Sequence, residues 1–220
     1  MKKKIIFYLN NDEIFTFPIA FFLIKKFIRK YNISIKLCNT SLRKKIKIIL
    51  ILLLENRIFK FFYFYKKKIS LEKLTVYKNV RLVKEIKKNE YLFGVSINYP
   101  KKITDKTFNI YNFHFGNFKE QRGTFIFFYK NIFKWINIDL TFHQIKNKLD
   151  SGRVINKKMI NVKKMNALEL IALPLKNKNF YFESILKIYR NNNKNNKQKN
   201  SIGPLNKEPS FVKIFKAKFN

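Results

Sequence analysis

The chain has 220 residues, which is enough for one α/β domain with a sizeable core and a short extension. Its 48 Lys and Arg residues outweigh 13 Asp and Glu residues, and the formal charge of +35 attracts polyanions such as nucleic acid or an anionic membrane. The single cysteine, Cys38, excludes an internal disulfide and a cysteine-rich metal cluster, and it fits a reducing cytoplasm.

The start of the chain predicts a buried strand followed by a helix. Its opening, MKKKIIFYLNND, is basic like a secretory signal, but the apolar run ends at Asn10 and no small-residue cleavage site follows. The apolar run over residues 4–9 therefore predicts a strand, and apolar positions at helical spacing over 13–30 predict a helix. Apolar runs at 17–24 and 48–54 are about half the roughly 20 residues that a membrane-spanning helix needs.

Strands and helices continue to alternate along the chain. Residues 33–38 predict a second strand, and Ser41 is a candidate N-cap for a basic, apolar helix over 41–62, although 58–65 fits a helix or a strand. The remaining predicted elements are strands at 74–78, 91–99, 109–114 and 136–143, a short helix or turn at 101–109, a helix at 122–133, and a helix from 163 to about 190 that is interrupted at Pro174.

This alternation predicts an α/β fold with a mostly parallel sheet flanked by helices. We expect residues 1–190 to form the domain, and residues 191–220 to form a basic, Asn/Lys-rich linker and tail.

Scarce polar residues gather near the ends of two predicted strands. Asn112 and His114 have period-two spacing and project to one face, and Thr141 and His143 do the same further on. Asp150-Ser151-Gly152 follows as a turn. A carboxamide, an imidazole and a carboxylate at strand ends can together polarise a carbonyl and move a proton. Taken singly, His143 also fits a hydrogen-bonded core residue, and Asp150 fits a simple turn.

The order of these fragments resembles the catalytic domain of the formyltetrahydrofolate-dependent formyltransferases. The matching pieces are 93-FGVSINYP-100, 112-NFH-114, 122-RG-123, 141-TFH-143 and 150-DSG-152. The chain departs from many members after the histidine, where it has 115-FGNFKEQ-121 in place of a Pro-Ser-Leu-Leu-Pro-like loop. The resemblance covers about residues 91–156 and implies a Rossmann-like fold.

The resemblance also implies a reaction and its residues. It gives 10-formyltetrahydrofolate as the formyl donor and needs no metal. Asn112 would hold the formyl oxygen, His114 would stabilise the developing oxyanion, and Asp150 would interact with His114 and assist proton removal from an attacking amine. The implied folate-binding residues are Tyr99, Pro100, Gly116 and Gly152, while Arg122 and His143 would line the substrate site.

The acceptor stays open at this stage. The basic charge favours methionyl-tRNA, to which we lean slightly. An amino-sugar nucleotide is the other candidate, because the roughly 30 residues after Arg190 leave no room for the C-terminal barrel domain of full-length methionyl-tRNA formyltransferases. A non-catalytic RNA-binding protein is the alternative from another class, with lysines on phosphates and aromatics stacked on bases. However, Lys, Asn, Ile and Phe are enriched together along the whole chain, as AT-rich coding sequence also produces. Lysine runs such as 25–30, 44–47 and 66–68 usually form solvated faces.

Overall fold

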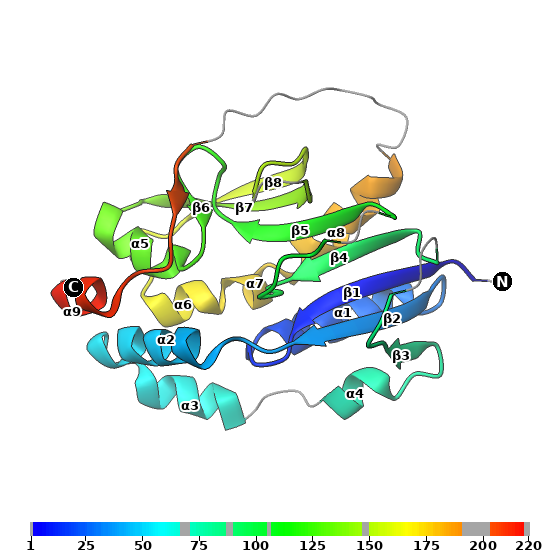
Figure 1. Ribbon diagram of the computed structural model, residues 1–220, viewed down its shortest axis with the longest axis horizontal. Helices are drawn as coiled ribbons and strands as arrows, with labels where there is room; N and C mark the ends of the chain where they lie inside the picture. The colour runs from blue at the N-terminus through cyan, green and yellow to red at the C-terminus, as the bar shows by residue number, and fades with distance from the viewer. Residues whose placement is uncertain are drawn as a thin grey trace.

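A computed structural model describes residues 2–66, 71–86, 90–104, 107–146, 150–190 and 203–217. A seven-stranded sheet runs through the molecule in the order β3-β2-β1-β4-β5-β7-β8 (Figure 1). The strands are β1 (Lys4–Asn10), β2 (Asn32–Cys38), β3 (Val80–Leu82), β4 (Phe93–Ile97), β5 (Ile110–Phe115), β7 (Asn137–Gln144) and β8 (Val154–Asn161).

The sheet is mostly parallel, as the sequence predicted. The pairs from β3 through β5 are all parallel, whereas β7 is antiparallel to both β5 and β8. The carboxyl ends of β1, β2, β4 and β5 therefore meet at one edge, where α/β folds bind their ligands.

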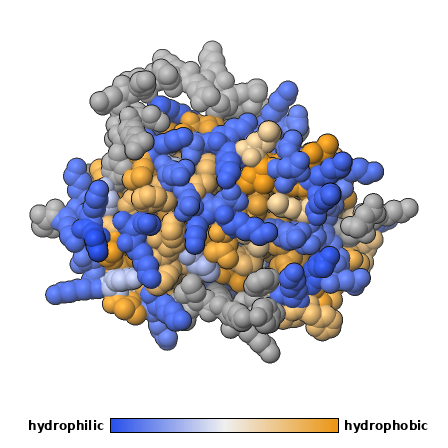
Figure 2. Space-filling view, turned by 180° about the vertical axis from the view of Figure 1, so that it is seen from behind, coloured by the Kyte–Doolittle hydropathy of each residue, from blue (hydrophilic) through white to orange (hydrophobic). Residues whose placement is uncertain are grey.

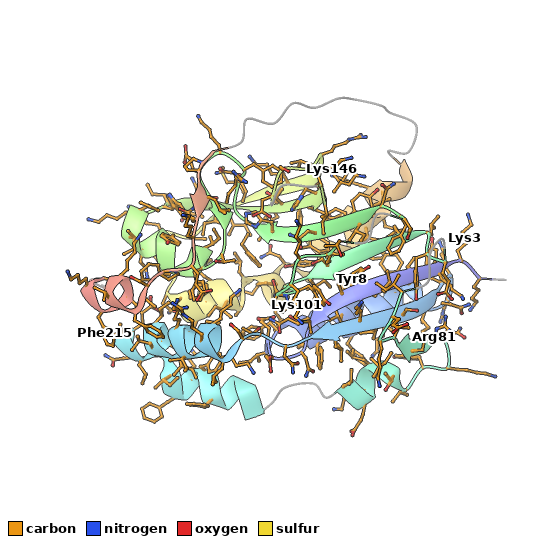
Figure 3. The ribbon with its side chains drawn as sticks, in the orientation of Figure 1. Lys3, Tyr8, Arg81, Lys101, Lys146 and Phe215 are labelled. Atoms are coloured by element: carbon orange, nitrogen blue, oxygen red, sulfur yellow. The ribbon has the colours of Figure 1, made fainter. Side chains whose placement is uncertain are left out.

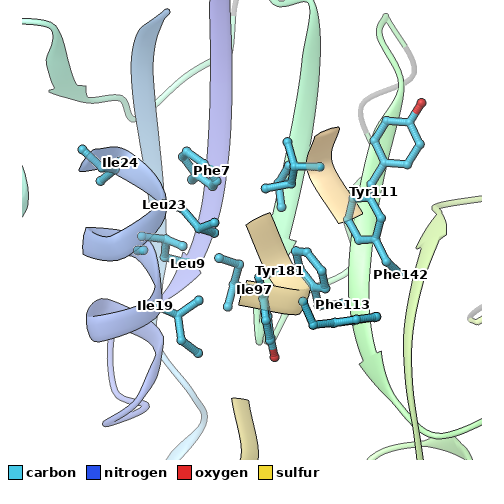
Figure 4. Packing of buried hydrophobic residues seen from close by; sticks show 14 of the residues in the cluster. Phe7, Leu9, Ile19, Leu23, Ile24, Ile97, Tyr111, Phe113, Phe142 and Tyr181 are labelled. Atoms are coloured by element: carbon cyan, nitrogen blue, oxygen red, sulfur yellow. The ribbon is translucent and has the colours of Figure 1, made fainter. Parts of the chain in front are cut away.

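Two helices cover one face of the sheet. Helix α1 (Thr16–Phe27) packs Ile19, Leu23 and Ile24 against β1 and its neighbours (Figure 4). Helix α8 (Lys178–Arg190) places Tyr181 against Phe113 of β5, with 4.1 Å between the ring centroids. Because consecutive strand residues alternate between faces, Ile6 and Tyr8 of β1 point the other way and pack with loop residues such as Ile103 and Phe108.

A second hydrophobic cluster lies beyond the carboxyl ends of the strands. It joins α2 (Leu42–Leu54), α3 (Ile58–Lys66), α5 (Ile126–Phe133), α6 (Ala167–Ile171) and α9 (Phe211–Lys216). Its buried members include Ile51, Leu52, Ile58, Phe128 and Ile214. These helices form the end of the molecule at the left of Figure 1.

The described part of the C-terminal segment packs on the domain. Strand β9 (Leu205–Asn206) pairs in parallel with β6 (Arg122–Gly123), and α9 contacts α2. Residues 191–202, which contain the predicted linker, lie outside the described residues. The domain boundary near residue 190 stays a prediction.

Most predicted elements are present, with three differences. Residues 74–78, predicted as a strand, fall at the end of helix α4 (Leu71–Thr75), and the edge strand β3 begins only at Val80. The helix predicted over 41–62 is two helices, because the chain turns at Asn56, whose φ is 53°. The helix predicted from 122 begins at Ile126, since Arg122 and Gly123 pair with β9.

Two other expectations hold in detail. Ser41 caps α2, accepting a hydrogen bond from the Lys44 amide at 3.4 Å. The broken C-terminal helix is α6, α7 (Leu173–Lys176) and α8, with Pro174 in the first turn of α7, where proline costs no hydrogen bond.

Candidate active site

The pairing of β5 with β7 aligns the polar residues that the sequence singled out. Asn112 lies opposite His143, and His114 lies opposite Thr141. Directly opposed residues of an antiparallel pair project to the same face, so these four side chains share one side of the sheet. The pairing of β7 with β8 is irregular between Phe142 and His143, next to the site.

Asp150 lies between the two imidazoles of the site. Its Oδ1 atom is 3.6 Å from His114 Nδ1 and 3.6 Å from His143 Nε2. Its Oδ2 atom accepts a hydrogen bond of 3.1 Å from the Gly123 amide. Asp150 has a φ of 45°, a left-handed conformation that Asp tolerates better than most residues. The structure therefore brings together Asn112, His114, His143 and Asp150.

A hydrogen bond to a main-chain carbonyl orients the His114 ring. Its Nε2 atom donates to the Gln121 carbonyl oxygen at 2.8 Å, which leaves Nδ1 as the ring nitrogen that faces Asp150. Gly116 makes this arrangement possible: its φ is 131°, and a Cβ there would be 2.1 Å from the same carbonyl oxygen. The predicted folate residue Gly116 thus has a positioning role toward His114.

Gln121, which sequence reasoning missed, is the centre of this support. Its side chain donates to the Asn137 carbonyl oxygen at 2.8 Å and accepts from the Asn117 amide at 3.1 Å. The side chain is buried although the charged residues Glu120 and Arg122 flank it in the sequence. A glutamine beside the Arg-Gly element carries no period or spacing that marks it as buried.

His143 is neutral because of its surroundings. Burial, assisted by His114, lowers the pKa of His143 from 6.5 to about 4, although Asp150 opposes the shift. Nδ1 of the ring donates to the Gln144 carbonyl oxygen at 3.0 Å, so Nε2 carries a lone pair. Asn112 Nδ2 lies 3.4 Å from that atom and donates to it.

A cavity of about 950 Å³ extends from these residues along the carboxyl ends of the strands. Asn112, His143 and Asp150 line it, whereas His114 lies behind Asp150 and is not among the lining residues. Tyr99 and Pro100, predicted to bind folate, also line the cavity.

The other predicted site residues have different neighbours. Gly152 allows a close approach, because a Cβ there would be 1.6 Å from the Gln144 carbonyl oxygen. Arg122 donates to the Gly203 carbonyl oxygen, and it is the next residue, Gly123, that lines the cavity. The predicted contacts of Gly116, Gly152 and Arg122 with cofactor or substrate stay predictions.

The loop after β1 adds polar groups that the sequence did not single out as a site. Asn10 donates to Thr40 Oγ1 at 2.9 Å, and both residues line the cavity. Glu13 lines it too and accepts hydrogen bonds from Thr16 and Asn98, while burial raises the pKa of its carboxyl. Their position directly after a predicted strand was the available signal.

Lysines surround the cavity, but the 44–47 run is not simply a solvated face. Lys47 is buried and pairs with Glu208 at 2.6 Å, and Lys44 lies over the Phe125 ring at 5.6 Å from its centroid. Burial lowers the pKa of Lys44, and Glu208 opposes this shift. On the face of the molecule shown in Figure 2, hydrophilic side chains alternate with apolar patches. Figure 3 shows Lys101 and Lys146, which line the cavity, on different loops.

The C-terminal segment reaches the loop that supports the site. Gly203 donates its amide to the Phe118 carbonyl oxygen at 2.8 Å, and Asn206 donates to the Glu120 carbonyl oxygen at 3.1 Å. Gly123, which donates to Asp150, is held in the β6–β9 pairing. Among the described residues, no group of three or more His, Cys, Asp or Glu side chains could hold a metal ion.

No protein-family model and no curated protein sequence matches this chain. Similar solved structures include a 4-N formyltransferase from Francisella tularensis, 18% identical over 93% of this chain and 76% of the other, with a TM-score of 0.57. Another is WlaRD, a sugar 3N-formyltransferase crystallised with dTDP and 5-N-formyl-THF, 18% identical over 91% of this chain and 67% of the other, with a TM-score of 0.58.

A third similar structure is an N-formyltransferase from Helicobacter canadensis in complex with folinic acid and dTDP-3-aminofucose. It is 16% identical over 87% of this chain and 65% of the other, with a TM-score of 0.56. The chain thus spans about two thirds to three quarters of the length of these three proteins. At such identities the likeness concerns the fold, and the chain has the Rossmann-like fold of the formyltransferases.

Proposed function

We propose that this protein transfers a formyl group from 10-formyltetrahydrofolate to a primary amine. The observation that carries the proposal is the meeting of Asn112, His143 and Asp150 on one cavity, with His114 directly behind Asp150. Phosphate binding alone needs no such arrangement, so the non-catalytic RNA-binding alternative leaves it unexplained.

The cavity fits a folate. Its wall combines Tyr99, Pro100, Ile103 and Ile145 with polar side chains such as Asn112, and this mixture suits a flat, partly polar ring system. When bound, the donor supplies an electrophilic formyl carbon whose oxygen becomes negative as the amine attacks.

Each residue of the site has a role in that attack. Asn112 lines the cavity, and its carboxamide nitrogen donates to the developing oxyanion in place of His114, which does not line the cavity. Asp150 takes a proton from the attacking nitrogen, and His114, whose Nδ1 faces the carboxylate, can accept that proton from it and then stabilise the carboxylate as an imidazolium. The new C–N bond replaces the bond from the formyl carbon to the donor nitrogen, which leaves with a proton, so that the products are a formamide and tetrahydrofolate.

An amino sugar linked to a nucleotide is the acceptor that we favour on likeness. Two of the similar structures are named as a sugar formyltransferase or hold dTDP-3-aminofucose. The cavity also has space for a second substrate beside the donor, with hydrogen-bonding groups at Asn10, Thr40 and Ser96.

Methionyl-tRNA is the second candidate, favoured by charge. The formal charge of +35 attracts a polyanionic acceptor, and Lys44, Lys45, Lys101, Lys102 and Lys146 line the cavity. A tRNA acceptor predicts that activity falls steeply with salt, because each neutralised phosphate releases condensed counterion.

The two acceptors are distinguished by direct assay. The protein is incubated with 10-formyltetrahydrofolate and either a dTDP-linked amino sugar or methionyl-tRNA, and tetrahydrofolate release is followed. We expect release with one of them and none without an amine. If neither acceptor stimulates release in a folded protein, the proposed function is wrong.

A further inference from the structure

Exposed apolar side chains concentrate on three neighbouring helices at one end of the molecule. Among the described residues, 16 large hydrophobic side chains are exposed, and eight of them belong to α2, α3 and α9. We call these eight the apolar patch: Leu42, Ile46, Leu53, Leu54, Phe59, Phe62, Val212 and Phe215. Helix α2 contacts both α3 and α9, so the three helices that carry the patch are neighbours.

Helix α2 is apolar on opposite sides. Its inner side buries Ile51 and Leu52 in the second hydrophobic cluster. Leu42, Ile46 and Leu53 are spaced by four and seven residues, which places them on one stripe on the side of the helix away from Ile51. An ordinary surface helix is polar there, so this outer stripe indicates a second apolar contact.

The other two helices expose aromatic rings. The Phe59 side chain of α3 is 86% exposed, and that of Phe215 in α9 is 63% exposed. Figure 3 shows Phe215 at the extreme end of the molecule. Ile214, the residue before Phe215, is buried in the second hydrophobic cluster, so α9 is anchored while Phe215 faces outward.

The charge around the patch is mostly positive, although Glu55 directly follows Leu54 and accepts hydrogen bonds from Asn131 and the Ala167 amide. The sequences of α2, α3 and α9 contain no Asp or Glu. Exposed basic side chains border the patch at Arg43, Arg57, Lys60, Lys213 and Lys216. The neighbouring acidic residue Glu208 is already paired with buried Lys47.

We propose that the apolar patch docks on the surface of an anionic lipid membrane. Phenylalanine and leucine rimmed by lysine and arginine is the combination that inserts shallowly among lipid headgroups while the cations meet their phosphates. Within the described chain, no helix is long and apolar enough to cross a membrane, so contact is with the surface.

Docking at this patch also orients the cavity. Phe62 belongs to the patch and lines the cavity, and Phe61 beside it lines the cavity as well. The rim of the cavity therefore faces the bilayer when the patch is bound.

Vesicle co-sedimentation tests the proposal without any assay of activity. The full chain is mixed with phosphatidylcholine vesicles that contain or lack phosphatidylglycerol. We expect sedimentation with the anionic vesicles, weakened by salt. The Phe59→Ser/Phe215→Ser variant should partition onto the anionic vesicles at least roughly tenfold less than the unchanged protein. The burial of one phenylalanine ring by itself accounts for a factor of about ten or more in partitioning.

A matched control removes apolar side chains elsewhere. Val76, which directly follows helix α4, is 76% exposed, and Met159 of strand β8 is 67% exposed. Neither residue belongs to the patch. The Val76→Ser/Met159→Ser variant should bind anionic vesicles within about twofold of the unchanged protein.

Three results would overturn the proposal. One is no sedimentation with anionic vesicles. Another is equal binding of the patch variant and the unchanged protein, which would leave charge alone as the cause. The third is a dimer in light scattering that Phe59→Ser/Phe215→Ser converts to a monomer, which would make the patch a protein interface.

Discussion

The strand-end site and the helical end of α2, α3 and α9 use the same chain composition in opposite ways. At the site, scarce polar groups are buried and each has a defined partner, as His114 has with the Gln121 carbonyl and Asp150 with the Gly123 amide. At the helical end, abundant apolar and basic residues are exposed, as Phe59 is. The site therefore depends on exact positions, whereas the helical end depends on the kind of side chain that it exposes.

The largest expected effect comes from removing groups of the site. His114→Ala and Asp150→Asn should each lower turnover by about a hundredfold or more, because one removes the support of the carboxylate and the other removes its charge. The double variant should lose far less than the product of the single losses, since both act on one transition state. Turnover within about twofold of the unchanged protein for His114→Ala, in protein that circular dichroism shows to be folded, would contradict the assignment.

Acid should destabilise the folded protein through protonation of His143. Its pKa is about 4 in the folded chain, so between pH 6.5 and pH 4 the unfolded chain binds the proton more tightly. The free energy of unfolding should therefore fall by about 3 kcal/mol as the pH drops through this window, and be retained above it. Urea unfolding over this pH range measures the slope, and His143→Gln should flatten it. An unchanged slope in that variant would assign the effect to another group.

Gly116→Ala should break the support of His114. Its φ of 131° and the 2.1 Å approach to the Gln121 carbonyl oxygen leave no space for a Cβ atom. We expect a loss of about 2 kcal/mol of unfolding free energy, measured in urea, together with lower turnover. A variant as stable and as active as the unchanged protein would show that this turn can rearrange freely.

The smallest effect on stability is expected at the helical end. Phe59→Ser should change the free energy of unfolding by less than about 0.5 kcal/mol, because the side chain is already in water. Ile214→Ala, on the buried side of α9, should cost about 2 kcal/mol or more. Equal losses for the two variants would mean that the patch is not separate from the core.

Much of the sheet could be predicted from the sequence because strands such as β1 are short, mostly apolar runs. The runs at β1 and β5 end in Asn, Asp or Gly, which mark turns. Residues 74–78 were mispredicted as a strand because local apolar character there serves packing of Leu74 in helix α4 instead. Tertiary contacts of this kind leave no local period.

The candidate site could be only partly predicted from the sequence. Asn112, His114 and Asp150 were found from their order, and the structure brings them together. Gln121 supports His114 with its main-chain carbonyl, which every residue possesses, so no residue type could mark it. The contribution of residues 203–208 was missed because it depends on pairing with a segment about 80 positions earlier.

That pairing has a consequence for how the protein is made. Gly123 donates to Asp150 while it is paired with Asn206, and Arg122 of the same strand contacts Gly203. During synthesis, the N-terminal strands and both histidines leave the ribosome well before residues 203–206. The loop that holds Asp150 then lacks its covering strand, so a nascent chain can complete its sheet before it completes the candidate site.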